Sequence, residues 1–176
     1  MRGQRVLVAF GVVLTIATLV MGSLAGRHPS CATGSLIELE VARTEERAVE
    51  LIGPCDEAGL DVLRDGLRAD NRGFVPLYVA SVGLWALLGA RRLAWSSEGR
   101  RRAVTAAAAA IVAAGAFDLV ENHHLGKVID AAGASSDIGM ASTASIVKWV
   151  LVLYAVPVAA IAMVRCIRAA VARPTT

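Results

Sequence analysis

The sequence has little charge for its length. Asp, Glu, Lys and Arg make up 19% of its 176 residues, where about 25% is typical of soluble domains. Aromatic residues are also sparse, at 5%, whereas hydrophobic residues reach 56%. The net charge of +3 comes from arginines at the edges of apolar blocks and not from one basic face, which excludes a soluble nucleic-acid binder. The composition also excludes a disordered chain and indicates helices that lie in a membrane.

Familiar catalytic and cofactor-binding motifs are absent as well. The sequence contains no G-x-S-x-G, Walker loop, H-E-x-x-H or nucleotide-binding fingerprint. Glu121 and His124 form one Glu-x-x-His step, but a carboxylate-bridged di-iron bundle needs two such steps and two further glutamates. A haem held by two histidines is not expected either, because no second histidine lies inside an apolar block. We therefore expect no bound metal and no cofactor.

Four apolar blocks are each long enough to cross a membrane as a helix of about 20 residues. They cover about residues 6–25, 74–90, 103–122 and 144–164. We expect an all-α membrane protein, a four-transmembrane-helix bundle that forms one membrane domain over residues 1–176. For the first block the alternative is a cleaved signal peptide, although its apolar run exceeds the usual length of about 7 to 15 residues.

The distribution of cations predicts the orientation, because short loops rich in Lys and Arg remain cytoplasmic. With both termini inside, the inner side holds ten arginines and a single acid, Glu98. In the second outer loop, residues 123–143, Lys127 is the only lysine or arginine. This pattern predicts a multi-pass protein of the plasma membrane with both termini in the cytoplasm.

The outer segment between the first two spans, residues 27–73, is too long for a plain loop and has helical patterns of its own. Ser35 and Glu38 have the spacing of a capping box. A later run has leucines three and four residues apart, and we expect this helix to continue toward the second span. We interpret the charges from Glu38 to Glu50 as a solvated helix face. A charged surface that binds a partner is the alternative.

The sequence has three cysteines, of which two lie in this outer segment. A disulfide between Cys31 and Cys55 would close a loop of about 25 residues in an oxidising compartment. Two free thiols are the alternative, and Cys166 at the cytoplasmic end of the last span is expected to be free. No C-x-x-C occurs, so nothing indicates a redox relay.

Polar and ionisable residues inside the apolar blocks are the most informative feature, because a charge at the centre of a membrane helix costs about 2.5 to 3.5 kcal/mol. Three of them share one face of the third span, since they are three and four residues apart. Residues of the second and fourth spans reach a similar depth near the outer surface. We expect one polar cluster of six residues: Asp70, Tyr78, Asp118, Glu121, Asn122 and Lys148.

Two interpretations of this cluster remain open. In the structural one, Lys148 pairs with Asp118 or Glu121 and fixes the register of the helices, with about 1 kcal/mol from each buried polar contact. In the functional one, the cluster is a ligand-binding or catalytic pocket, in which two neighbouring carboxyl groups serve as acid and base.

Three motifs link these residues: Asp70-x-x-x-Phe74-x-x-x-Tyr78, Asp118-x-x-Glu121-Asn122, and Lys148 in the last span. In these motifs, over nearly the whole chain, the sequence resembles a family of small bacterial four-span membrane proteins to which no activity is assigned. The resemblance implies that the six residues act as one unit in the plasma (inner) membrane of a bacterium. It implies no substrate and no cofactor, and the paired cysteines are not part of it.

Three functions fit these expectations. The first is a polytopic membrane binding or accessory protein, whose polar pocket opens toward the extracytoplasmic leaflet and holds a lipid headgroup or a small amphiphile. The second is a membrane-embedded acid/base enzyme, an isomerase or hydrolase that acts on an apolar substrate through Glu121 or Asp118. The third is a structural scaffold subunit for a membrane-protein partner. The sequence leaves open whether the chain is an enzyme.

Overall fold

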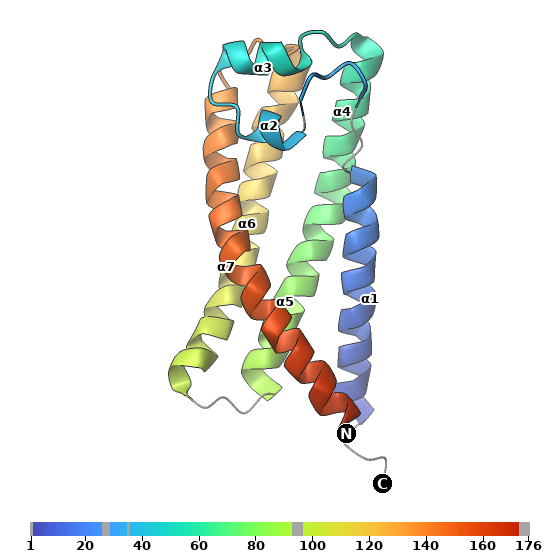
Figure 1. Cartoon of the computed structure of the whole chain (residues 1–176), viewed down its shortest axis with the longest axis vertical. Coiled ribbons are helices and arrows are strands. Elements are labelled where there is room, and N and C mark those ends of the chain that lie inside the picture. The colour runs from blue at the N-terminus through green and yellow to red at the C-terminus, as the bar shows by residue number, and fades with distance from the viewer. Residues whose placement is uncertain (1, 26–28, 35, 93–96, 173–176) are drawn as a thin grey trace. The chain divides into compact units, whose positions relative to one another are not determined.

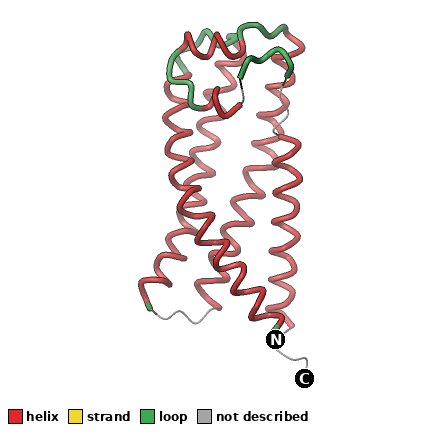
Figure 2. The backbone as a smooth tube through the Cα atoms, viewed as in Figure 1, coloured by secondary structure: helices red, strands yellow, loops and turns green. Residues whose placement is uncertain are grey.

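The structure is a computed structural model that describes residues 2–25, 29–34, 36–92 and 97–172. Within these ranges all regular structure is helical and no strand occurs (Figure 2), which confirms the all-α prediction for them. The helices are α1 (Arg2–Ala25), α2 (Leu36–Glu40), α3 (Glu45–Ile52), α4 (Glu57–Ala69), the π-helical segment η1 (Asp70–Phe74), α5 (Val75–Arg92), α6 (Glu98–Asp130) and α7 (Ile138–Val171) (Figure 1).

Four helical stretches are long enough and apolar enough to cross a membrane. They are Arg5–Ser23, Glu57–Arg91, Glu98–Asp130 and Ile138–Val171. The last two contain 33 and 34 residues, which corresponds to about 50 Å at 1.5 Å per residue. A hydrocarbon core is about 30 Å thick, so α6 and α7 are longer than a membrane crossing requires.

The chain divides into two compact units, and the single membrane domain over residues 1–176 stays a prediction. The first unit contains Met1–Leu19, Leu77–Ala114 and Val150–Thr176, and the second contains Val20–Pro76 and Gly115–Trp149. Helices α6 and α7 contribute residues to both units.

Small residues bring the helices of the first unit close together. A Cβ atom at Gly11 of α1 would lie 2.7 Å from the ring of Trp85 on α5, and the indole nitrogen of Trp85 donates a hydrogen bond of 3.0 Å to Thr15 Oγ1. A Cβ atom at Gly89 of α5 would lie 2.6 Å from the Cβ of Ala162 on α7. Close approach at small side chains is typical of helix contacts in membranes.

The second unit has an apolar core built from α2, α3, α4 and the adjoining ends of α6 and α7. Figure 1 shows the short helices α2 and α3 beside these ends. The core side chains include Leu39, Leu51, Ile52, Leu60, Leu63, Leu67, Leu125, Val128, Ile129 and Ile138. The region between the first two spans therefore folds into helices that cover the ends of α6 and α7. The predicted capping box involves Ser35, which lies outside the described residues.

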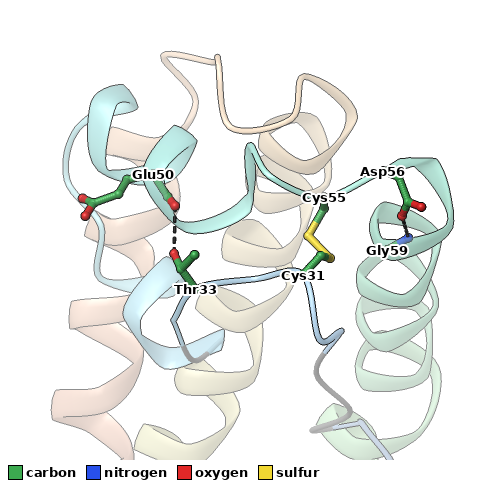
Figure 3. The surroundings of a disulfide bond; sticks show 6 residues. All are labelled: Cys31, Thr33, Glu50, Cys55, Asp56 and Gly59. Carbon is green, nitrogen blue, oxygen red and sulfur yellow. Dashed lines mark hydrogen bonds between the residues drawn. A yellow bond between two sulfur atoms is a disulfide. The ribbon is translucent and has the colours of Figure 1, made fainter.

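A disulfide joins Cys31 to Cys55, as the sequence analysis predicts (Figure 3). The two Cα atoms are 5.0 Å apart. Thr33 Oγ1 donates a hydrogen bond of 2.8 Å to the carbonyl oxygen of Glu50, and Asp56 caps α4 by accepting a bond of 2.9 Å from the backbone nitrogen of Gly59 (Figure 3). The disulfide and the Thr33 bond therefore fasten the start of the segment to α3 and to the residue that precedes the cap of α4. Cys166 is free and buried.

Candidate functional site

Lys148 of α7 lies in the second unit with three carboxylates around its ammonium group. The nitrogen is 2.7 Å from Glu121 Oε2 and 3.3 Å from Asp118 Oδ1, both on α6. It is 3.4 Å from Glu40 Oε2 at the end of α2. The exposed fractions of these side chains are 8% for Lys148, 0% for Glu121, 7% for Asp118 and 13% for Glu40. We call these four residues the lysine–carboxylate site.

The connection between α6 and α7 explains why distant residues of these helices meet. Glu121 lies nine residues before α6 ends at Asp130, and Lys148 lies ten residues after α7 begins at Ile138. The two helices run in opposite directions from one short turn, so both residues are about 14 Å from it at 1.5 Å per residue. Asp118 is three residues from Glu121 and therefore shares its face of α6.

The turn itself depends on a glycine. Gly133 has a φ of 93°, and a Cβ atom there would lie 2.6 Å from the backbone nitrogen of Val49 on α3. A side chain at this position would be strained in its backbone and would clash with α3. The glycine thus lets α3 pack against the turn.

Asn122, the residue after Glu121, makes a second set of polar contacts. Its amide nitrogen donates to Asp70 Oδ2 at 2.5 Å and to Asn71 Oδ1 at 3.0 Å. Asp70 and Asn71 are consecutive residues of η1, and the wide turn of a π-helix reduces the angle between consecutive side chains, so both reach one donor. Single π-helical turns inside longer helices occur frequently at functional sites.

Five of the six predicted residues therefore come together in the second unit: Asp70, Asp118, Glu121, Asn122 and Lys148. Asp70 also lies within electrostatic range of Asp118 and Lys148. Tyr78 is also buried and belongs to the first unit, and its place in the polar cluster stays a prediction.

Sequence reasoning missed Glu40, Asn71 and the contact of Trp149 with this region. Trp149 Nε1 donates to Glu40 Oε2 at 3.4 Å. The assignment of the charges from Glu38 to Glu50 to a solvated face is wrong for Glu40, although the other glutamates of that stretch are exposed. The helical spacing could have indicated that Glu40 is not solvated. Glu40 is four residues after Leu36 and therefore continues the apolar face of α2.

Two buried oxygen atoms near Lys148 have no hydrogen-bond partner in the described part of the chain. Glu121 uses Oε2 for its ion pair with Lys148, whereas its Oε1 receives no hydrogen bond. Ser145 Oγ is also without a partner, and both residues are 0% exposed. Buried polar atoms are normally satisfied, so these two atoms could still accept hydrogen bonds.

A separate ionic contact lies at the turn between α6 and α7. Asp137 Oδ1 is 2.6 Å from His124 Nδ1 and 3.0 Å from Lys127 Nζ. These hydrogen bonds, the one from His124 first, lower the pKa of Asp137 to about 2. The two residues of the Glu-x-x-His step therefore have different partners, because Glu121 contacts Lys148 while His124 contacts Asp137. Among the described residues, no three His, Cys, Asp or Glu side chains are arranged to hold a metal ion.

The low pKa of Asp137 predicts that acid weakens this turn. Its folded pKa of about 2 lies below the unfolded value of about 3.9, so its stabilising contribution is present above about pH 4 and is lost as the pH falls toward 2. We expect Asp137→Asn to unfold at a lower temperature than the parent at pH 7, with the difference shrinking from pH 4 to pH 2. Thermal unfolding in detergent at several pH values measures this, and equal stability at pH 7 would contradict it.

Comparisons of this chain with models of protein families, with curated proteins and with solved structures give no match.

Proposed function

We propose that the protein is a membrane-spanning binding or accessory protein whose lysine–carboxylate site holds the headgroup of a lipid or small amphiphile. One observation carries the proposal. The site is a buried ionic cluster on two helices that are apolar enough to span a membrane. Glu40 completes it and comes from the disulfide-closed segment. A charge inside a membrane helix is costly and indicates a functional role.

The disulfide supports an extracytoplasmic position for the site. Disulfides persist in oxidising compartments outside the cytosol, and Glu40 lies between Cys31 and Cys55 in the closed loop. Ser142 of α7 donates a hydrogen bond to the carbonyl oxygen of Ala42, two residues after Glu40. The closed segment therefore packs on α7 beside the site, which supports the proposal that both lie on the extracytoplasmic side.

The length of the helices supports a headgroup as the ligand. Helices of about 50 Å exceed a hydrocarbon core of about 30 Å by about 20 Å. With this excess divided equally between the two sides, a site about 14 Å from the outer helix ends lies about 4 Å below the boundary of the hydrocarbon. Trp149 next to Lys148 is partly exposed, and tryptophan is typical of that boundary.

Native mass spectrometry of the protein purified in mild detergent tests this proposal. We expect the parent to retain a lipid or amphiphile and Glu121→Gln to lose most of it, about tenfold or more, because a hydrogen bond to a charged group contributes about 1.5 to 3 kcal/mol. Glu50→Gln is the matched control, since Glu50 is an exposed glutamate of the closed segment that pairs with Arg47. A parent without bound lipid, or equal retention by all three proteins, would contradict the proposal.

The proposal also requires the predicted orientation in the plasma membrane. Reporter fusions after Arg27, Arg101 and Thr176 are expected to lie outside, inside and inside. We expect the mature chain to keep α1, because Thr15 of this helix hydrogen-bonds Trp85 within the first unit. A mature N-terminus near Gly26, or an inside position after Arg27, would be the opposite result.

A further inference from the structure

We infer that the lysine–carboxylate site recognises an ammonium group with N–H donors, carried by an aminated lipid headgroup or by a free long-chain amine. The inference rests on the proposed function and specifies its ligand. It follows from the charge balance of the site and from the two buried oxygen atoms without partners.

The charge balance favours a cation. Glu40, Asp118 and Glu121 contact Lys148, and Asp70 lies within electrostatic range of Asp118, Lys148 and Glu40. Three carboxyl groups thus contact one ammonium group, and a fourth carboxyl group, that of Asp70, interacts with it electrostatically. A buried carboxylate is stable when it is paired with a positive group, so an additional cation would stabilise this arrangement. A ligand with net negative charge would add to the repulsion between the carboxylates.

The unpartnered oxygen atoms favour hydrogen-bond donors. Ser145 is three residues before Lys148 and shares its face of α7, while Glu121 is three residues after Asp118 on α6. Because the helices are antiparallel, Ser145 and Glu121 lie on the same side of the Lys148–Asp118 pair, toward the turn. Their free atoms, Glu121 Oε1 and Ser145 Oγ, can both accept hydrogen bonds. A primary ammonium group has three N–H donors and no acceptor, which matches these atoms.

The same chemistry predicts selectivity between headgroups. A trimethylammonium group carries the positive charge but has no N–H, so it cannot satisfy Glu121 Oε1. A glycerol headgroup has hydroxyl donors, but its lipid is anionic overall. The site should therefore prefer ethanolamine lipids to choline lipids and to glycerol lipids of the same chain length.

The experiment uses the full-length protein reconstituted in nanodiscs that contain equal amounts of phosphatidylethanolamine, phosphatidylcholine and phosphatidylglycerol with identical chains. After mild detergent extraction, native mass spectrometry counts the lipids that remain bound. We expect phosphatidylethanolamine to be retained at least tenfold over the other two. We expect this preference to disappear in Glu121→Gln, to weaken in Ser145→Ala and to persist in Glu50→Gln. Glu121→Gln leaves Lys148 with Asp118 and Glu40, and its thermal unfolding verifies that it folds.

A second arm separates the two sources of the ammonium group. Dodecylamine and dodecyltrimethylammonium are added to the delipidated protein, and the change in unfolding temperature is measured. If dodecylamine stabilises the parent and no ethanolamine lipid is retained, the ligand is a free amine, which still supports the inference. Retention of lipid that depends on Glu121 but shows no preference for N–H donors would overturn the inference and leave the proposed function standing. A parent that binds none of these molecules would overturn both.

Discussion

Replacing Lys148 with methionine is expected to lower the free energy of unfolding by about 3 to 5 kcal/mol, the usual cost of removing one partner from a buried ionic group. The substitution keeps much of the side-chain volume but removes the ammonium group. Glu121, Asp118 and Glu40 then face one another without it in a site that is almost closed to solvent. Titration with SDS in mixed micelles measures the loss. Lys127→Met is the control, because Lys127 is half-exposed and surface ion pairs contribute about 0 to 1 kcal/mol.

Double variants separate a structural role of Lys148 from a functional one. If Lys148 only neutralises its partners, Lys148→Met with Glu121→Gln should recover more stability than Lys148→Met with Asp118→Asn, because Glu121 is closer to Lys148 and fully buried. Glu40 remains in both variants, so recovery should be incomplete. If the site binds a ligand, neither double variant should regain lipid retention, even where stability returns. Full stability and full retention in both Lys148→Met and Glu121→Gln would contradict both interpretations.

Loss of the disulfide is expected to have the second-largest effect. The chain-entropy model gives about 3.5 kcal/mol for a closed loop of about 25 residues, and the sequence separation of Cys31 and Cys55 is 24. Since Glu40 lies within this loop, the variant Cys31→Ser with Cys55→Ser should also retain less lipid at the lysine–carboxylate site.

Reductant supplies the control for the disulfide. It should lower the unfolding temperature and the lipid retention of the parent but change neither in the double serine variant. Cys166 is free in both proteins, so an equal response of the two to reductant would point to Cys166 instead. Alkylated Cys31 in parent protein prepared without reductant would show that the pair is not linked.

The sequence predicts where the four apolar helices lie better than where they end. The third apolar block of the sequence ends at about residue 122, but α6 continues to Asp130. The added turns are stable because Leu125 and Ile129 pack in the core of the second unit. In the same way, Ile138 packs in this core, so α7 begins there and not at about residue 144. Hydropathy marks contact with lipid, whereas these ends are stabilised by contacts within the protein.

The same distinction separates the residues of the candidate site that the sequence predicts from those that it does not. Asp118, Glu121 and Lys148 could be placed together because helical spacing and depth are local properties of two helices joined by a short turn. Glu40 could not, since it belongs to a helix of five residues whose position depends on the packing of its neighbours. The π-helical turn that aligns Asp70 and Asn71 has no local sequence signal that we recognise. It becomes visible through the two hydrogen bonds from Asn122.

The short turn between α6 and α7 also bears on biosynthesis. Asp118 and Lys148 are 30 residues apart in the sequence, so the ribosome completes the acidic helix before it makes the lysine that neutralises it. A lone carboxylate in a membrane helix costs about 2.5 to 3.5 kcal/mol on entry into the bilayer. That cost falls when the partner helix enters at the same time, because the opposite charges are already adjacent. With the membrane position that we propose, the two helices would be suited to leave the translocon together, as a hairpin, and not one after the other.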